Sequence, residues 1–363
     1  MQHIVTFGEI MARLMPEGYL KLRQALPGKL NVTFGGAEAN VAVSLAYMGA
    51  PATFVSALPK NELANACIAS LNSLQVNTRF ITRTKKGRLG LYFVEAGANQ
   101  RPSKVVYDRH GSAIALTPPE EYPWKDIFNN AKWFHLSGIT PALSQAAADA
   151  ALSAVKAAKN AKLTVSCDLN FRKKLWLWDS NYSQQELAEN TMRQLLPFVD
   201  VVLANEEDTQ KVLGIRADHT DVEAGQLAIH KYPDVAREVT RQYPNVSKVA
   251  ITLRQSISAS HNNWAAMLYD ATKKEAFFAP CQNSTCQPYQ INHIVDRVGG
   301  GDAFAAGLIF ALTTPDLNLP QTAIAYATAA SCLAHSIPGD FNLTTRSEIE
   351  SLMKGSQSGR IVR

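Results

Sequence analysis

The sequence predicts an α/β fold: a doubly wound, mostly parallel sheet with helices on both faces and a small β-sheet lid. Two observations lead to this prediction. Short apolar runs alternate with long helix-like runs along most of the 363 residues, as in a parallel sheet covered on both sides. Residues 10–34 and 89–113 break that rhythm with β-prone pieces and turn residues.

The alternating elements can be placed in order along the chain. The apolar runs expected as strands are residues 3–8, 52–58, 163–168, 200–204 and 248–253. The runs expected as helices are residues 37–48, ending before Gly49, the alanine-rich stretch 142–161, and then 302–312 and 321–335.

The two irregular regions predict the lid. Residues 89–113 form a hairpin signature, because two β-rich runs flank the turn Gly97-Ala98-Asn99. Neither region fits a helix-covered sheet. We therefore expect one domain over 1–363, with a lid formed by insertions at about 10–34 and 89–113.

Composition and charge exclude several classes of protein. Hydrophobic residues make up 46% and charged residues 18%, which excludes a disordered chain. The 36 Lys and Arg against 31 Asp and Glu leave +5, scattered rather than striped, so no nucleic-acid partner is expected. Apolar stretches such as 41–49 are too short to span a bilayer, so no membrane partner is expected either.

Residues 1–9 lack the pattern of a secretory signal, and we expect a cytoplasmic location. The chain has five cysteines, an odd number, and free thiols are the expectation for a reducing compartment. Cys281 and Cys286 lie near His293, but a zinc site needs a fourth ligand and tighter spacing. We interpret them as two ordinary loop cysteines.

The strongest functional signal is the segment from Asp296 to Gly307, in which three glycines precede a helix. Glycine N–H groups are not obstructed by side chains, and a helix N-terminus adds unpaired donors and partial positive charge. The run from Gly299 to Gly301 therefore predicts an anion site suited to a phosphate. Asp302 follows in the first turn, where a carboxylate either caps the helix or accepts a proton from a hydroxyl beside the phosphate.

Other phosphate-binding motifs do not fit the sequence. A Walker A loop requires Gly-Lys-Ser/Thr, whereas Gly28-Lys29 is followed by Leu30. A dinucleotide fingerprint requires a third glycine where Phe304 stands, and it should follow the first strand. Protein-kinase signatures are absent from the sequence.

A second glycine motif, Gly35-Gly36, opens the helix expected at 37–48. Two glycines permit a ligand to approach the backbone closely, and Asn40 can direct an amide toward it one turn later. The same residues also suit a tight turn from lid to helix, with Asn40 as a local hydrogen-bonding group. The motif alone leaves both interpretations open.

Together, the two glycine motifs resemble the signature regions of the PfkB, or ribokinase-like, carbohydrate kinases in order and separation. Within that family the chain is most similar to the 2-keto-3-deoxygluconate kinases, through segments 7–11, 107–113, 168–172 and 337–342. The resemblance implies a ribokinase-like fold that uses ATP and Mg²⁺. The implied reaction transfers the γ-phosphoryl group to the terminal (C6) hydroxyl of the sugar acid.

The resemblance also implies the catalytic groups. Asp302 matches the family's base, and the run Gly299, Gly300 and Gly301 matches its backbone anion hole. Arg172 matches a residue that holds phosphate oxygens or the substrate. Gly300 stands where relatives often carry alanine, a difference that we expect to be harmless.

The implied sugar-binding set joins both glycine motifs to the lid and to the C-terminal region. On the lid, Arg109 and the hydroxyls of Tyr92 and Tyr107 suit the carboxylate of a sugar acid. Asp340 matches a residue that contacts a sugar hydroxyl in relatives. The whole set is Gly35, Gly36, Asn40, Tyr92, Tyr107, Arg109, Asn170, Arg172, Asp302 and Asp340.

Nucleotide and metal contacts are implied on the other side. The segment 205–208 resembles the family's Asn-x-x-Glu element, which organises the Mg²⁺ shell through water. It offers Asn205 and Asp208, with aspartate in place of glutamate and Glu207 as a substitute. Relatives often place a Leu-Gly-x-x-Gly turn where residues 252–256 here contain no glycine. The implied nucleotide contacts are Asn170, Asn205, Thr252, Arg254, Gly299 and Gly301.

These assignments predict a sugar-acid kinase whose ligands are a small sugar acid, ATP and Mg²⁺. A homo-oligomer, dimer or larger, is expected because lids in this family often pair. Two alternatives stay open: a fructokinase or ribokinase of the same family, and a non-catalytic sugar-acid-binding protein on the same fold. A nicotinamide dehydrogenase is disfavoured by the mismatch to the dinucleotide fingerprint.

Overall fold

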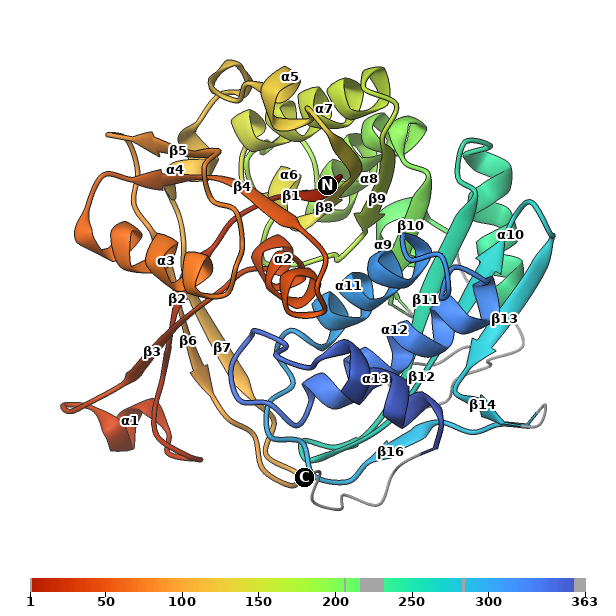
Figure 1. Ribbon diagram of the computed structural model, residues 1–363. Coiled ribbons are helices and arrows are strands. Elements are labelled where there is room, and N and C mark those ends of the chain that lie inside the picture. Colours follow the sequence, from red (N-terminus) through yellow and green to blue (C-terminus); the bar gives the residue numbers. More distant parts are fainter. Residues whose placement is uncertain (1, 206, 216–231, 283–284, 356–363) are drawn as a thin grey trace.

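A ten-stranded sheet lies at the centre of the computed structural model, which describes residues 2–205, 207–215, 232–282 and 285–355 (Figure 1). The strand order is β13-β12-β11-β10-β9-β8-β1-β4-β5, and β16 pairs with β12. The strands are β1 His3–Phe7, β4 Ala52–Pro59, β5 Ile81–Thr84, β8 Ala131–Ser137, β9 Thr164–Asp168, β10 Val201–Ala204, β11 Lys248–Ser258, β12 His261–Asp270, β13 Glu275–Ala279 and β16 Tyr289–Ile291.

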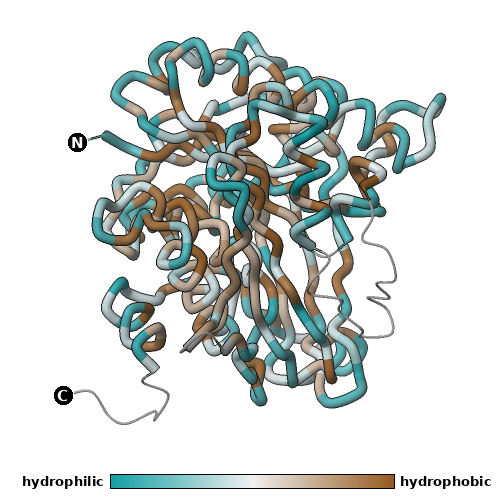
Figure 2. Tube along the Cα trace, turned by 90° about the vertical axis from the view of Figure 1, so that its right-hand side faces the viewer, coloured by the Kyte–Doolittle hydropathy of each residue, from teal (hydrophilic) through white to brown (hydrophobic). Residues whose placement is uncertain are grey.

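The strands from β5 to β11 in this order pair in parallel, and β12, β13 and β16 pair antiparallel. This arrangement confirms the predicted mostly parallel sheet. The parallel strands are apolar and buried, and the hydropathy colouring shows them as a brown interior beneath a teal surface (Figure 2). Because parallel strands end at the same edge, loops from β9, β10 and β11 meet there.

Helices cover both faces of the sheet, with one core cluster under each layer. One face carries α2 Ala37–Tyr47, α3 Glu62–Ser73, α11 Gly300–Leu312, α12 Pro320–Ala334 and α13 Arg346–Met353. The other face carries α4 Ala113–Leu116, α5 Trp124–Ile127, α6 Ile139–Ala142, α7 Gln145–Asn160, α8 Gln184–Leu195, α9 Asp208–Leu213 and α10 Tyr232–Gln242, with short 3₁₀ turns at Pro119–Glu121 and Leu196–Phe198.

Two predicted boundaries were wrong. Helix α7 begins at Gln145 rather than at 142, because Ser144 caps it by accepting a hydrogen bond from the Ala147 N–H at 3.0 Å. Strand β11 continues to Ser258 rather than ending at 253, because it stays paired with β12 as far as His261. The apolar pattern of β11 ends at Leu253, but its pairing with β12 continues beyond that residue.

The lid is a separate four-stranded sheet in the order β3-β2-β6-β7, at the lower left of Figure 1. Its strands are β2 Met11–Met15, β3 Asn31–Gly35, β6 Gly90–Glu95 and β7 Lys104–Asp108, with the short helix α1 Leu22–Ala25 beside them. Both predicted insertions therefore supply this sheet. Strand β2 lies between β3 and β6, so the two insertions pair with each other.

The interpretation of Cys281 and Cys286 as free thiols was wrong. They form a disulfide, because they lie directly opposite each other in the two-stranded sheet of β14 Cys281–Gln282 and β15 Thr285–Cys286. The remaining cysteines, Cys67, Cys167 and Cys332, are free. Within the described residues, no helix combines the length and apolar character needed to cross a bilayer.

A buried carboxylate ties the start of α2 to the sheet. Glu38 Oε1 accepts hydrogen bonds from the N–H and the hydroxyl of Ser137 at 2.9 and 2.7 Å, and from Thr140 Oγ1 at 3.1 Å. Its Oε2 has no hydrogen-bond partner within the described part of the chain. Burial is the main cause that raises the pKa of Glu38 to about 7, and the Ser137 hydrogen bonds oppose this shift.

This raised pKa predicts a dependence of stability on pH. A carboxyl with a higher pKa in the folded state stabilises the protein when protonated, so its contribution is lost as pH rises from about 4.5 to about 7. Glu38→Gln should flatten that profile. Relative to wild type, the variant's free energy of unfolding in urea should improve by roughly 1–3 kcal/mol between pH 5 and pH 8. The exposed Glu275→Gln is the control, and parallel profiles for wild type and Glu38→Gln would contradict the argument.

Candidate active site

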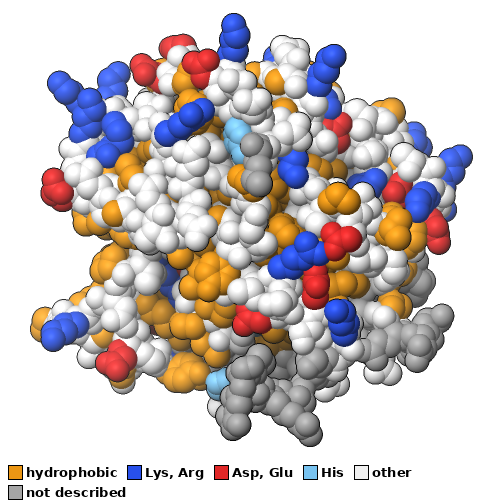
Figure 3. Space-filling model, in the orientation of Figure 1, with side chains coloured by type: hydrophobic (Ala, Val, Ile, Leu, Met, Phe, Trp, Pro, Cys, Tyr) orange, Lys and Arg blue, Asp and Glu red, His pale blue; other side chains and the backbone are white. Residues whose placement is uncertain are grey.

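A cavity of about 350 Å³ lies where the carboxyl ends of the parallel strands face the lid and the start of α11. In the space-filling view the surface is hollowed between the lid and the body (Figure 3). Of the residues predicted for the site, only Glu207 does not line this cavity. Those that do are Gly35, Gly36, Asn40, Tyr92, Tyr107, Arg109, Asn170, Arg172, Asn205, Asp208, Thr252, Arg254, Gly299, Gly300, Gly301, Asp302 and Asp340.

The glycine run forms the N-terminus of α11, as predicted. Gly299 is the N-cap, with φ of 83°, in the left-handed region that favours glycine. A Cβ at Gly299 would lie 2.3 Å from the carbonyl oxygen of Asp340, so no side chain fits there. Gly301 has open space where a Cβ would point. The first-turn N–H groups of α11 therefore face the cavity side as donors without intrahelical partners.

The reverse change, from Gly300 to alanine, would bring a side chain against a buried neighbour. A Cβ at position 300 would lie 2.9 Å from Cε1 of His335, whose Nδ1 is 2.7 Å from the carbonyl oxygen of Ser331. Ser331 in turn donates its hydroxyl to the Gly300 carbonyl at 2.6 Å. The buried imidazole takes the space that a methyl group would need, which explains why glycine stands here.

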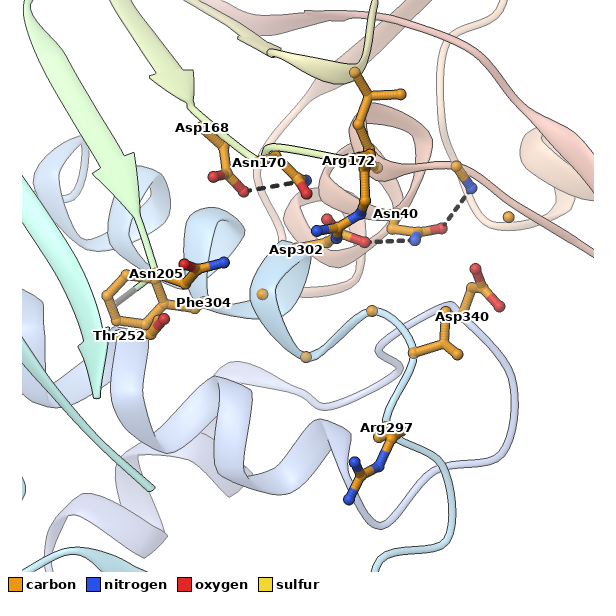
Figure 4. Close-up of a pocket in the computed structure, with 18 of the residues that line it drawn as sticks. Asn40, Asp168, Asn170, Arg172, Asn205, Thr252, Arg297, Asp302, Phe304 and Asp340 are labelled. Carbon is orange, nitrogen blue, oxygen red and sulfur yellow. Dashed lines mark hydrogen bonds between the residues drawn. The ribbon is translucent and has the colours of Figure 1, made fainter. Parts of the chain in front are cut away.

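Asp302 and Asn40 meet across the cavity from α11 and α2. Asn40 Nδ2 donates to Asp302 Oδ2 at 2.6 Å, and the Gly36 N–H donates to Asn40 Oδ1 at 3.1 Å (Figure 4). Burial raises the pKa of Asp302 to about 6, while the Asn40 hydrogen bond lowers it. The Asn40 amide thus holds the Asp302 carboxylate in place. By lowering its pKa, the amide also increases the ionised fraction of the carboxylate at neutral pH. Asn40 touches the proposed base itself, a contact that the sequence motif did not reveal.

Carboxylates and one arginine gather at the ends of β9 and β10. Asp168, which sequence reasoning missed, lies near Asp208 and Asp302, and Asn170 Nδ2 is 3.5 Å from its Oδ2 (Figure 4). Burial and then those neighbouring carboxylates raise the pKa of Asp168 well above its ordinary value. Arg172 is exposed at this edge and opposes the shift. The signal in the sequence was that the run ending at Arg172 follows a predicted strand, which indicated the carboxyl edge of the sheet.

Asn205 and Asp208 are tied to each other and to the start of α9 by hydrogen bonds. The Asp208 carboxylate accepts the N–H groups of Phe171 and Asn205, both at 3.1 Å, while Asn205 Oδ1 accepts two N–H groups at the start of α9. Glu207 forms an ion pair with Lys211 on the helix surface, away from the cavity. No group of three or more His, Cys, Asp or Glu side chains could hold a metal directly in the part of the chain that is described. Asn205 and Asp208 both line the cavity.

The lid residue Tyr92 and the C-terminal residue Asp340 meet on the sugar side predicted from the sequence. Tyr92 donates its hydroxyl to Asp340 Oδ2 at 2.5 Å, and a Cβ at Gly35 would lie 2.2 Å from that oxygen. A Cβ at Gly36 would lie 2.0 Å from the carbonyl oxygen of Glu9. Gly35 and Gly36 therefore permit close approach of the protein's own groups, in addition to any ligand.

The predicted lid arginine is already paired. Arg109 donates from Nε to Glu9 Oε2 at 2.8 Å and from Nη2 to the same oxygen, and the pair is buried at 9% and 3% side-chain exposure. The Arg109 guanidinium also lies over the ring of Tyr107, 5.3 Å from its centroid. Glu9 thus occupies the edge of the Arg109 guanidinium formed by Nε and Nη2. A bound carboxylate would meet the remaining edge, which carries Nη1. Glu9 belongs to the segment 7–11 that carried the resemblance, but no role was predicted for it.

Thr252 and Arg254 lie on β11 and line the cavity. Residues 252–256 form part of the strand and not a turn, since Arg254 pairs with Trp264 and the pairing of β11 with β12 continues to Ser258. The tip of the β11–β12 hairpin is held by Arg297, which donates from Nη2 to the carbonyl oxygens of Ser258 and Ala259. The pairing of β11 with β12 therefore directs the side chains of Thr252 and Arg254 to the cavity, at a place where relatives often have glycines.

Arg13 does not line the cavity but bonds Asp340, which does, and sequence reasoning missed it. Its side chain is 2% exposed and donates to the carboxylates of Asp340 and Asp296 at 2.7 and 2.5 Å. A charged residue between the apolar residues of the segment MARLM, which forms β2, was the available signal. Only the fold could show which carboxylates, about 300 positions away in sequence, it meets.

Comparisons with known proteins agree with this geometry. The family model "pfkB family carbohydrate kinase" matches residues 1–236. The chain is 29% identical over 356 residues to the 2-dehydro-3-deoxygalactonokinase of Haloferax volcanii, with 98% of each chain covered. It is 44% identical to the 2-dehydro-3-deoxygluconokinase structure from Thermotoga maritima, with a TM-score of 0.88 over 98% of this chain and 100% of the other.

A further structural neighbour, described as a ribokinase II from E. coli and solved with ATP and Mg²⁺, has a TM-score of 0.75 at 20% identity. It covers 98% of this chain and 100% of that one, and at this identity it shows the shared fold. The family model covers well over half of the residues, and both glycine motifs lie in one cavity with Asp302. The chain therefore belongs to the pfkB family of carbohydrate kinases.

Proposed function

We propose that the protein transfers the γ-phosphoryl group of ATP to the terminal C6 hydroxyl of 2-keto-3-deoxygluconate. One observation carries the proposal: a single cavity joins the helix N-terminus at the glycine run, the Asp302 carboxylate, and the arginines Arg109 and Arg172. The 44% identity to the Thermotoga maritima 2-dehydro-3-deoxygluconokinase supports the choice of substrate.

In this proposal Asp302 accepts the proton of the attacking hydroxyl. Its position in the first turn of α11 places it beside the N–H donors that would face the phosphate oxygens. Asn40 orients the carboxylate through its amide. Proton acceptance by a positioned carboxylate, together with correct alignment of the hydroxyl, supplies the chemistry that a loose, anionic transition state requires.

Charge on the phosphates is the second requirement. The N–H groups of the run Gly299 to Gly301 and the guanidinium of Arg172 would hold the phosphate oxygens. Asn170, Asn205 and Asp208 would hold Mg²⁺ through its water shell, and the ion when bound neutralises phosphate charge. The excess of carboxylates around Asp168 fits a nearby cation. Thr252 and Arg254 would contact the nucleotide from β11.

The substrate carboxylate would bind the lid. Arg109 would meet it through the edge that Glu9 leaves open, with the Tyr107 hydroxyl beside it, while Asp340 and Tyr92 would contact a sugar hydroxyl. A second candidate, a fructokinase, is favoured by 25% identity over 361 residues to probable fructokinase-4 of Arabidopsis thaliana. The paired state of Arg109 is compatible with a neutral sugar as well, so substrate assays must decide between them.

The proposal extends to assembly and location. The lid region carries exposed large apolar side chains, and such patches mark protein interfaces. We propose that the protein forms a dimer or larger homo-oligomer through the lid, and that it works in the cytoplasm, where ATP is available. The exposed lid residues are Tyr19, Leu20, Leu26, Val32, Val106 and Tyr107.

The first prediction concerns the base. Asp302→Asn keeps the size of the side chain but removes the proton acceptor, so kcat should fall by roughly 10² to 10⁴. The dissociation constant for ATP and the unfolding transition should stay near the wild-type values. A coupled kinase assay and calorimetry measure these quantities, and near-normal turnover would remove Asp302 from the mechanism.

The second prediction concerns pH. The base must be deprotonated, so kcat/KM for the sugar acid at saturating ATP should fall on the acid side with a midpoint near pH 6, the pKa of Asp302. Asn40 lowers that pKa by donating to the carboxylate, so Asn40→Ala should raise it. The variant should therefore lose more activity at pH 6 than at pH 8. Superimposable acid limbs in the two pH profiles would show that Asn40 does not tune the base.

The third prediction concerns substrate choice. Loss of one charge-assisted hydrogen bond costs roughly 1.5–3 kcal/mol. Arg109→Ala should therefore raise the KM for the sugar acid about ten- to a hundredfold, at about 1.4 kcal/mol per decade. The KM for ATP should hardly change. Arg109→Lys should restore only part of the loss, since an ammonium group lacks the planar fork.

The control for this experiment is Arg88→Ala, because the ion pair of Arg88 with Asp108 is also on the lid but is exposed. The wild-type enzyme is assayed in parallel on fructose, ribose, and the gluconate- and galactonate-derived keto acids. Equal turnover of fructose, or an unchanged sugar-acid KM in Arg109→Ala, would replace this assignment with a general sugar kinase.

A further inference from the structure

A single buried guanidinium connects the sugar side of the cavity with the glycine run. Arg13 Nη1 donates to Asp340 Oδ1 at 2.7 Å, and Nη2 donates to Asp296 Oδ2 at 2.5 Å. We propose that Arg13 is a positioning residue that couples sugar binding to nucleotide binding. The inference rests on the proposed use of Asp340 for the sugar and of the glycine run for the phosphates.

The sugar half of this link begins on the lid. Arg13 on β2 and Tyr92 on β6 lie directly opposite each other in the sheet register. They take different oxygens of the same carboxylate, Arg13 bonding Oδ1 and Tyr92 bonding Oδ2 of Asp340. A sugar that contacts Asp340 or Tyr92 therefore also restrains the Arg13 guanidinium.

The nucleotide half runs through Asp296. Its Oδ1 accepts the N–H of Val298 at 3.1 Å, one residue before the glycine run begins. Its Oδ2, which bonds Arg13, also accepts the N–H of Gly339 at 3.1 Å, one residue before Asp340. Gly299 in turn packs against the Asp340 carbonyl oxygen. The contacts form a closed ring, so a shift of Arg13 moves the start of the phosphate-binding run.

Burial makes the link stiff. The side chains of Arg13, Asp296 and Asp340 are 2%, 8% and 4% exposed, so water cannot replace their hydrogen bonds. Burial raises the pKa of Asp340, and the positive charge of Arg13 opposes that rise. Without the guanidinium, two buried carboxylates would face each other with less compensation, and their separation would not be fixed.

The test compares ligand binding alone and in pairs. Calorimetry measures the dissociation constant of a non-hydrolysable ATP analogue with Mg²⁺, with and without the sugar that the wild-type enzyme phosphorylates fastest. Wild type should bind the analogue at least about fivefold more tightly when the sugar is present, a typical coupling. In Arg13→Met the ratio should fall close to one, and Arg13→Lys should recover only part of it because an ammonium group cannot present two fixed donors.

Because Arg13→Met leaves a buried charge imbalance, the double variant Arg13→Met/Asp296→Asn removes one carboxylate along with the cation. It should fold and still lack coupling. Arg88→Met, which breaks only an exposed lid ion pair, should retain the wild-type ratio. If a folded Arg13 variant keeps that ratio, or wild type shows none, the inference is wrong. The sugar for this test is the one that wild type phosphorylates fastest. If the proposed substrate is wrong, a different sugar is therefore used, but the ratio of the two dissociation constants still tests the role of Arg13.

Discussion

The buried carboxylate of Asp340 brings together stretches of chain that are far apart in sequence. Arg13 and Tyr92 of the lid bond its two oxygens, while Gly35 and Gly299 pack against its carboxylate and its carbonyl. A Cβ on either glycine would lie within 2.3 Å of an Asp340 oxygen. The two glycine motifs are therefore constrained by one loop of the protein. In the proposed mechanism, the loop that carries Asp340 therefore sets the distance between the sugar and the phosphates.

The cavity has more acidic than basic groups along its floor. Burial is the main cause that raises the pKa values of Asp168, Asp208, Asp302 and Asp340, and it does so because a charged carboxylate loses hydration there. Four arginines also line the cavity, but the five acidic groups outnumber them, so an anionic nucleotide needs further positive charge there. The N-terminus of helix α11 supplies part of this positive charge, and the exposed guanidinium of Arg172 adds to it. A divalent cation bound with the nucleotide supplies the rest in the proposed mechanism.

Five strands of the main sheet and the glycine run at the start of α11 could be predicted because each has a local signature, whereas the strands β5, β8, β12 and β13 were not placed. Alternating apolar runs indicate buried parallel strands, and three glycines before a helix indicate exposed N–H groups. Partners across the fold have no such signature. Nothing near Arg109 in sequence indicates that Glu9, a hundred residues earlier, neutralises it, and nothing in the run 205–208 shows that Glu207 turns toward Lys211.

Two further differences follow from pairing rather than from residue type. Cys281 and Cys286 are ordinary loop cysteines in the sequence, and the antiparallel pairing of β14 with β15 places them opposite each other. Gly300 resembles an interchangeable small residue until His335 is placed against it. In both cases the deciding neighbour is set by backbone geometry. Sequence reasoning could name many of the residues that line the cavity, but it could not assign the contacts that restrict them.

The missing glycines after Thr252 have a structural consequence at the lid. Because β11 continues as a hairpin, its tip reaches the lid, where the Ala259 N–H donates to the Asn99 carbonyl at 2.7 Å and the Asn99 N–H donates to Ser260 Oγ at 3.1 Å. Two sets of contacts thus hold the lid. The buried contacts of Arg13 hold β2, and hydrogen bonds hold the tip of the lid at Asn99, where the bond to Ser260 is exposed. An exposed hydrogen bond contributes only about 1 kcal/mol because water can replace it, whereas a buried guanidinium cannot leave its carboxylates without a much larger cost. Opening of the cavity should therefore begin at the tip, with Arg13 as the fixed end.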